Sequence, residues 1–386
     1  MWQRYQSFVL SFVRIAIVCY PTVGGSGVVA TELAKALACR GHEVHLVSYE
    51  RPVRAIHCHP NLHLHQVEPP AYPLFRYLPY ESALAGRLVA LAESGVEIIH
   101  AHYAIPHAVS ALLASRYVGL NGQRLPFVTT LHGTDTTLAR EAPDLWPIIR
   151  LALYKSDVVT AVSHALARTT QEAFTLPEPP LVIPNFVDTQ VFAFRPMPEL
   201  RALYAHPQEY ILVHASNFRP VKQVPWLIQL FHRVRQAGLP AKLLLIGDGP
   251  ERPNVEKLVR EIGLERAVIF TGIVTEVQEY LSLGDVFLLS SREESFGLAV
   301  LEAMACGVPV LAPRTGGLPE VVQEGGLLYE PGDLDAAEKA LFQILRDLPT
   351  YRQAARQNAL RFDIHRIVPL YEKLYQTILT KASILS

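Results

Sequence analysis

Two glutamates, Glu294 and Glu302, lie eight positions apart in the stretch E-E-S-F-G-L-A-V-L-E-A-M-A-C-G. Between them, Phe296, Gly297 and Leu298 are expected to start a helix, and the first N–H groups of a helix have no acceptor within it. Such a start attracts a phosphate group, because the unpaired donors and the helix dipole point the same way. Two glutamates at this spacing are by themselves usually solvated surface residues, so their interpretation depends on the motifs around them.

A second stretch, H-A-S-N-F-R-P-V-K over residues 214–222, offers two cations to the same ligand. Arg219 presents a planar fork that bonds two phosphate oxygens at once, and Lys222 supplies a compact point charge. Glycine turns follow in I-G-D-G-P, F-T-G-I-V and T-G-G-L-P-E-V. Each is an ordinary turn alone, but together, at successive strand ends of one sheet, they indicate a common binding edge.

The N-terminal half carries polar turns of its own. Y-P-T-V-G-G-S-G, over residues 20–27, places Gly25 and Ser26 before a predicted helix, where a bound anion is favoured. H-A-H-Y-A-I-P-H (100–107) and T-T-L-H-G-T-D (129–135) end two predicted strands. Because ligands bind at the carboxyl ends of parallel strands, we expect these turns to line a site.

Hydrophobic periodicity places all these turns in a repeated alternation of strands and helices. The predicted strands are residues 13–19, 43–48, 61–67, 97–101, 127–131, 157–162, 181–183, 210–216, 241–247, 267–272, 285–290 and 308–312. The predicted helices are residues 28–40, 81–94, 106–118, 144–155, 164–174, 224–236, 251–261, 277–283, 297–306, 318–324 and 366–381. This pattern predicts an α/β protein with two Rossmann-like parallel-sheet domains. The predicted boundaries are 1–185, a proline-rich linker at 186–207, 208–365, and a C-terminal crossover helix at 366–386.

Composition excludes several classes of protein. The chain has 386 residues, 50% of them hydrophobic, which is enough for two well-filled cores. A net charge of −1 without clustered Lys and Arg predicts no nucleic-acid partner. No stretch approaches the roughly 20 apolar residues of a membrane span. Four cysteines without paired spacing predict reduced thiols in a cytoplasmic protein.

Two patterns resemble metal sites, and residues 1–13 resemble a signal peptide. H-C-H-P-N-L-H-L-H (57–65) places His63 and His65 on one face of a strand, which is compatible with metal binding. The segment has no supporting carboxylates nearby, so it is interpreted as an edge strand. D-L-D at 333–335 precedes a helix and is interpreted as its cap. Residues 1–13 lack a small-residue cleavage site and are interpreted as an extension or a misassigned start.

E-x7-E after a strand, with S-F-G inside it, resembles the signature of retaining glycosyltransferases of family 4. The resemblance implies the GT-B fold, in which two Rossmann-like domains face each other across a cleft and a C-terminal helix crosses back. It implies that Glu294 holds the donor sugar's hydroxyls and Glu302 the ribose of the nucleotide. It also implies that Arg219 and Lys222 neutralise the diphosphate, so no metal or other cofactor is expected. The family's arginine falls nearer Asn217, two positions before Arg219.

From residue 14 to residue 379 the chain resembles one group in this family. That group joins GlcNAc from UDP-GlcNAc to the hydroxyl of L-malate, the first step of bacillithiol biosynthesis. UDP-GlcNAc and L-malate are therefore the expected partners, without stable membrane insertion, and a homo-oligomer is left open. The expected catalytic residues are Glu294, Lys222, Arg219 and His132. The expected donor-binding residues are Gly25, Asn217, Asp248, Gly272, Phe296, Gly297, Leu298 and Glu302, and the expected acceptor-binding residues are Ser26, Tyr103, Thr130, Asn185 and Arg219.

Retention at the sugar carbon allows a covalent intermediate on Glu294 or a same-face attack, and the resemblance implies the second. A family-4 enzyme with a lipid or polysaccharide acceptor remains an alternative, and L-F-R-Y-L-P-Y (74–80) is the one short segment that fits a lipid. A sugar-nucleotide epimerase and a non-enzymatic nucleotide-sugar binder also remain. An NAD-dependent oxidoreductase is disfavoured, because G-x-G-x-x-G with a following acidic residue is missing.

Overall fold

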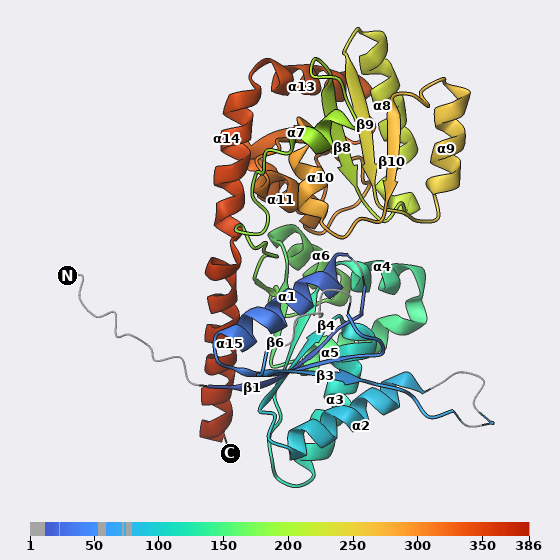
Figure 1. Ribbon diagram of the computed structural model, residues 1–386. Helices are drawn as coiled ribbons and strands as arrows, with labels where there is room; N and C mark the ends of the chain where they lie inside the picture. Colours follow the sequence, from blue (N-terminus) through green and yellow to red (C-terminus); the bar gives the residue numbers. More distant parts are fainter. Residues whose placement is uncertain (1–11, 23, 53–58, 72, 75–78, 386) are drawn as a thin grey trace. The chain divides into compact units, whose positions relative to one another are not determined.

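The computed structural model describes residues 12–22, 24–52, 59–71, 73–74 and 79–385 (Figure 1). Their contacts divide the chain into two compact units. Unit 1 comprises residues up to 162, 167–183 and 367 onward, and unit 2 comprises 163–166 and 184–366. The interpretation of residues 1–13 and of the segment 74–80 falls largely outside the described residues, as does Cys58.

Unit 1 is built on a seven-stranded parallel sheet in the order β3-β2-β1-β4-β5-β6-β7. Its elements are β1 (Arg14–Val18), α1 (Ser26–Cys39), β2 (Glu43–Ser48), β3 (Leu62–Gln66), α2 (Tyr80–Glu93), β4 (Ile98–His102), the π-helical turn η1 (Ala104–Ala108), α3 (Val109–Gly119), β5 (Phe127–Leu131), α4 (Thr134–Glu141), η2 (Pro143–Leu145), α5 (Trp146–Lys155), β6 (Val158–Ala161), α6 (His164–Phe174), β7 (Leu181–Val182) and α15 (Ile364–Leu385).

The side chains of β4 show how this sheet is covered on both faces. Ile99 and Ala101 pack into one apolar cluster with residues of α2 and α3. His100 points to the opposite face, where its Nδ1 lies 2.7 Å from the hydroxyl of Tyr375 on α15. Successive side chains of a strand alternate between faces, so this strand is buried on both sides.

Unit 2 is built on a six-stranded parallel sheet in the order β10-β9-β8-β11-β12-β13. Its elements are α7 (Pro198–Ala202), β8 (Tyr210–Ala215), η3 (Pro220–Lys222), α8 (Val224–Gln236), β9 (Ala241–Ile246), α9 (Arg252–Glu261), β10 (Val268–Gly272), α10 (Val277–Ser282), β11 (Val286–Leu288), α11 (Leu298–Ala305), β12 (Val310–Pro313), α12 (Leu318–Val322), η4 (Gln323–Gly325), β13 (Gly326–Tyr329), α13 (Leu334–Arg346), α14 (Leu348–Ala359) and η5 (Leu360–Phe362). Helices α8, α9 and α13 share one apolar cluster with the sheet.

The predicted fold class, two Rossmann-like α/β halves, is confirmed. The predicted helix over 144–155 is wrong at its start, because a 3-10 turn precedes α5, which begins at Trp146. Helix α4 was not predicted. The motif T-T-L-H-G-T-D (129–135) is typical of a turn, and residues 134–141 are too polar to show an apolar helix face. Strand β13 and helix α14 were also missed. Asp333 caps α13 as expected, accepting the Ala336 N–H at 2.9 Å.

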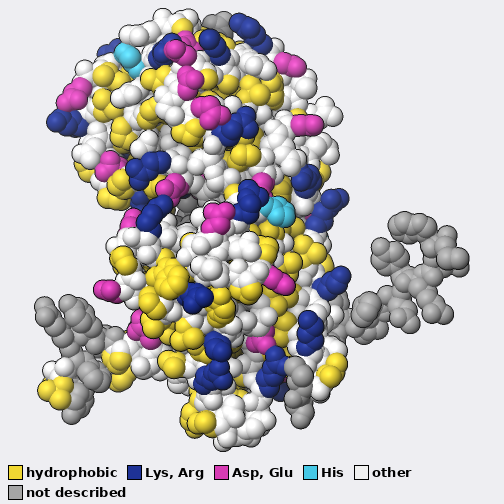
Figure 2. All heavy atoms as spheres, turned by 180° about the vertical axis from the view of Figure 1, so that it is seen from behind, with side chains coloured by type: hydrophobic (Ala, Val, Ile, Leu, Met, Phe, Trp, Pro, Cys, Tyr) yellow, Lys and Arg dark blue, Asp and Glu magenta, His cyan; other side chains and the backbone are white. Residues whose placement is uncertain are grey.

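Charge is distributed without a single-sign field on the face that Figure 2 shows, where basic and acidic side chains are interspersed. Among the described helices, none is both long and apolar enough to cross a bilayer.

Candidate functional site

In unit 2, the structure brings Lys222 and Glu294 together. Lys222 ends the turn after β8, and Glu294 lies in the loop that follows β11, the neighbouring strand. The ammonium group of Lys222 donates to Oε1 of Glu294. The same carboxylate oxygen accepts the Ser291 hydroxyl at 2.8 Å. Two groups predicted to handle one sugar nucleotide are therefore direct partners.

Two hydrogen bonds to main-chain carbonyls hold these two loops together. The Arg292 N–H donates to the Val221 carbonyl at 2.8 Å. The Ser290 hydroxyl donates to the carbonyl of Lys222, also at 2.8 Å. Because both bonds end on main-chain carbonyls of the Lys222 turn, the two loops are held next to each other without a ligand.

The T-G-G turn after β12 packs directly on the loop of Glu294. The Gly317 N–H donates to the Glu294 carbonyl at 2.9 Å. A Cβ on Gly316 would stand 1.9 Å from that carbonyl oxygen, and Gly316 has a φ of +51°. Only glycine fits this position, because a side chain would meet backbone and would occupy the left-handed region.

Helix α11 starts as predicted, with Gly297 as its N-cap in the left-handed conformation, φ 90°. Among the described residues, no acceptor is recorded for the N–H groups of Phe296, Gly297 or Leu298. Glu302 lies on the same helix, with 9% of its surface exposed. This helix start retains the donors that a phosphate requires.

The loop after β8 holds Asn217 and Arg219 on either side of a buried aromatic side chain. Phe218 is fully buried with a φ of +42°, whereas Asn217 and Arg219 are exposed. A Cβ on Gly249 would stand 1.9 Å from the Asn217 carbonyl. The glycine turn after β9 therefore packs closely against this loop at the edge of the sheet.

Two other predicted donor residues lie on turns at the same edge. Asp248 accepts the Gly249 N–H at 2.7 Å and the Arg252 guanidinium at 3.0 Å. The carbonyl of Gly272 accepts the Gly247 N–H at 2.8 Å. Both residues are thus part of the local turn structure, and their contact with a nucleotide stays a prediction.

In unit 1, Ser26, Tyr103 and His132 come together. They follow β1, β4 and β5, which are adjacent in the sheet. The hydroxyls of Ser26 and Tyr103 lie 2.6 Å apart. The ring centroids of Tyr103 and His132 lie 5.3 Å apart. Gly25 is the N-cap of α1, with a φ of 64°.

Thr130 and Asn185 lie in different surroundings. The Thr130 hydroxyl is fully buried and lies 2.6 Å from both His100 Nε2 and the Thr160 hydroxyl. Asn185 groups with unit 2, and its buried Oδ1 has no hydrogen-bond partner among the described residues. The acceptor-binding roles of both residues stay predictions.

The sequence did not predict a role for His102, the histidine whose ring lies within hydrogen-bond distance of His132. His102, the last residue of β4, is fully buried, and its Nδ1 lies 2.9 Å from His132 Nε2. Burial lowers the pKa of His132 to about 3 and that of His102 well below its usual value. The alternating H-A-H at the end of a predicted strand was the available signal, because it puts His100 and His102 on one face.

Asp135 was also missed as a structural group in this site. It is buried at the start of α4, and its Oδ1 accepts the Ala104 N–H at 2.8 Å. Burial raises the pKa of Asp135 to about 7. This carboxyl ties the turn after β5 to the turn after β4, which carries Tyr103.

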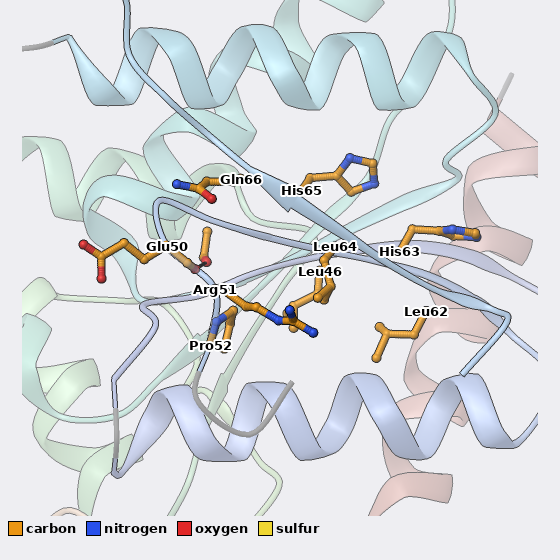
Figure 3. Close-up of a pocket in the computed structure, with 10 residues that line it drawn as sticks. Leu46, Glu50, Arg51, Pro52, Leu62, His63, Leu64, His65 and Gln66 are labelled. Atoms are coloured by element: carbon orange, nitrogen blue, oxygen red, sulfur yellow. Dashed lines mark hydrogen bonds between the residues drawn. The ribbon is translucent and has the colours of Figure 1, made fainter. Parts of the chain in front are cut away.

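The predicted edge strand, β3, carries a group of histidines that includes none of the predicted site residues. His63 and His65 of β3 share a face with His45 of β2, whose Nδ1 lies 2.9 Å from His65 Nε2. Within the described ranges, no group of three or more His, Cys, Asp or Glu is arranged to hold a metal ion. Figure 3 shows a hollow at this edge, and none of the predicted site residues lines it. Its lining consists of Leu46, Ser48, Glu50, Arg51, Pro52, Leu62, His63, Leu64, His65 and Gln66.

Comparisons with known proteins match both halves of the chain. The family described as "Glycosyltransferase Family 4" matches residues 23–191, and "Glycosyl transferases group 1" matches residues 209–347. The chain is 43% identical to N-acetyl-alpha-D-glucosaminyl L-malate synthase of Bacillus anthracis over 374 residues, which cover 95% of this chain and 97% of that enzyme.

Solved structures of glycosyltransferases share the fold. Sucrose-phosphate synthase from Thermosynechococcus elongatus superposes with a TM-score of 0.79 at 23% identity, covering 96% of this chain and 100% of that one. Anabaena HepE in complex with UDP and glucose superposes with a TM-score of 0.78 at 19% identity, covering 94% and 99%. At these identities the likeness establishes the fold alone, which is the predicted GT-B fold.

Proposed function

Because the chain belongs to glycosyltransferase family 4, we propose that it transfers GlcNAc from UDP-GlcNAc to the hydroxyl of L-malate, with retention at the anomeric carbon. The 43% identity, over almost the whole chain, to an N-acetyl-alpha-D-glucosaminyl L-malate synthase supports the choice of GlcNAc and L-malate. UDP as the carrier of the sugar is what the family resemblance implies. The retaining outcome and the use of protein cations in place of a metal are what the resemblance of the E-x7-E motif and its companion loop to this family implies.

The pairing of Lys222 with Glu294 is the observation that supports this function most directly. A cation suited to a diphosphate and a carboxylate suited to sugar hydroxyls are in contact. They lie beside a helix start whose first N–H groups have no acceptor in the part of the chain that the structure describes. When the nucleotide binds, Lys222 and Arg219 face the β-phosphate, and Glu294 accepts hydrogen bonds from the sugar. This arrangement stabilises charge where it develops as the leaving group departs.

In the proposed reaction, the bond from the anomeric carbon to the β-phosphate oxygen breaks. A bond to the malate hydroxyl oxygen forms on the same face of the sugar. The hydroxyl proton passes to an oxygen of the departing diphosphate, so the products are UDP and the GlcNAc–malate conjugate. One carboxylate of malate is held by Ser26 and the N–H groups at the start of α1. The remainder of malate is bound by Tyr103, whose hydroxyl lies beside that of Ser26, and by Thr130, Asn185 and Arg219.

The test is an assay of the product by mass. The protein is incubated with UDP-GlcNAc and, separately, with L-malate, D-malate, L-lactate or succinate, each with EDTA and with Mg²⁺. We expect a conjugate with L-malate in both conditions and none with succinate, which has no hydroxyl. A conjugate formed only with a lipid or polysaccharide acceptor, or a free epimerised sugar, would replace the proposal with one of its alternatives.

A further inference from the structure

One ring nitrogen of His102 has no hydrogen-bond partner in the part of the chain that the structure describes. Its Nδ1 faces His132 Nε2 at 2.9 Å, whereas its Nε2 is buried with no hydrogen-bond partner among the described residues. A bond between two imidazoles needs one N–H and one lone pair. The position of the proton on His102 therefore fixes the position of the proton on His132.

Both rings are neutral near pH 7, because burial lowers the pKa of each far below its usual value. Two arrangements then remain. With the proton on Nε2 of His102, a buried N–H would have no acceptor, and such orphaned donors are rare in folded proteins. With the proton on Nδ1, only an acceptor lone pair is left unpaired, which is tolerated better.

The neighbouring His107 has the same arrangement. Its Nδ1 lies 2.5 Å from the carbonyl of His102, so this nitrogen must carry the proton and donate. Its Nε2 then carries a lone pair, and within the described ranges this buried nitrogen too has no hydrogen-bond partner. The buried residues next to His102 thus already include one histidine with a proton on Nδ1 and, among the described residues, an unpaired Nε2.

We infer that His102 donates from Nδ1 to His132 Nε2 and thereby holds His132 in the tautomer with its proton on Nδ1. His132 is partly exposed, and among the described residues its Nδ1 has no partner. It offers a bound ligand a hydrogen-bond donor, not a lone pair. Given the proposed function, His132 binds an oxygen of a substrate and does not act as the general base, and His102 is its positioning residue.

The tautomer can be read directly by ¹⁵N NMR of protein labelled at histidine, with the His132 signals assigned through His132→Asn. We expect wild-type protein without ligand to show a protonated Nδ1 and an unprotonated Nε2 on His132. The opposite tautomer in wild-type protein would overturn the inference. This measurement needs no substrate, so it stands or fails independently of whether GlcNAc–malate is formed.

Two variants test the role of His102. His102→Phe keeps an aromatic ring but removes the donor, so His132 should shift toward the Nε2-protonated form that a free histidine side chain prefers. His102→Asn retains an amide donor near the Nδ1 position and should keep the wild-type tautomer. In the transfer assay, kcat/KM should fall roughly three- to tenfold in His102→Phe and recover in His102→Asn. A His132 that stays protonated on Nδ1 in folded His102→Phe would show that His102 does not set it.

Discussion

The ammonium group of Lys222 donates to a carboxylate oxygen of Glu294, although the two residues lie 72 positions apart and on loops after different strands. The contact exists because β8 and β11 are neighbours in the sheet and main-chain bonds tie their loops together. Parallel strands place such loops at one edge, which is where this fold binds ligands.

Removing either partner should stop transfer without unfolding the protein. Lys222→Ala and Glu294→Ala are each expected to lower kcat by about 10²–10³-fold, the usual effect of deleting one group that stabilises a developing charge. Steady-state kinetics and circular dichroism together would check this. Lys257→Ala, which removes an exposed pair with Glu261 on α9, is the matched control and should leave kcat unchanged. Turnover near the wild-type rate in either site variant would remove that residue from the mechanism.

Gly316→Ala should damage both stability and activity. The new Cβ would stand 1.9 Å from the Glu294 carbonyl oxygen at a φ of +51°, so the loop of Glu294 must move. We expect a loss of about 3 kcal/mol or more in the free energy of unfolding. Gly332→Ala separates backbone strain from steric overlap. Gly332 has a φ of +87°, but a Cβ added there would have no described atom within 4 Å. That control should lose about 1–2 kcal/mol and keep its activity, and equal losses in the two variants would contradict the packing argument.

The ion pair between Arg40 and Glu372 should stabilise unit 1. The guanidinium bonds both carboxylate oxygens, at 2.7 and 2.8 Å, and the Glu372 side chain is fully buried on α15. Among the described residues, Arg40→Ala leaves His42 as the one remaining partner of that carboxylate. We therefore expect the free energy of unfolding to fall by about 2–3 kcal/mol, a figure reduced because Arg40 is one-third exposed. Urea denaturation would measure it. Lys35→Ala, which breaks a pair with Glu32 on α1, should cost only about 0.5 kcal/mol.

Acid should destabilise the protein through its buried histidines. Burial lowers the pKa of His100 and His132 to about 3, and that of His102 well below 6.5. Between those values and about 6.5, the unfolded chain binds more protons than the folded protein. The free energy of unfolding should therefore fall as pH is lowered through this window, by about 1.4 kcal/mol per pH unit for each such histidine. Asp135 acts in the opposite direction, because burial raises its pKa to about 7. The stability that this group contributes is present below about pH 4 and is lost as pH rises from about 4 to about 7.

Denaturation curves at pH 7.5, 6 and 5 would measure this slope. His100→Asn should reduce the slope of the unfolding free energy against pH by the amount that corresponds to about one proton, because Asn cannot titrate. A free energy of unfolding that stays constant over this range would show that the histidines do not remain neutral in the folded protein.

The sequence predicted the layout of strands well, because buried parallel strands are short apolar runs bounded by turns. The strands β2 and β5 match the predicted limits, and Gly297 opens α11 as expected. Helix α4 was missed because it follows a glycine turn and lacks an apolar face. The contact of His102 with His132 could not be predicted, since it depends on how two strands 30 positions apart are paired.

The most direct test of the central claim is a crystal structure of the protein with UDP-GlcNAc or UDP. We expect the diphosphate to bind against Lys222, Arg219 and the start of α11, with the ribose beside Glu302 and the sugar hydroxyls on Glu294. A nucleotide bound elsewhere, or a diphosphate that Lys222 does not touch, would contradict it.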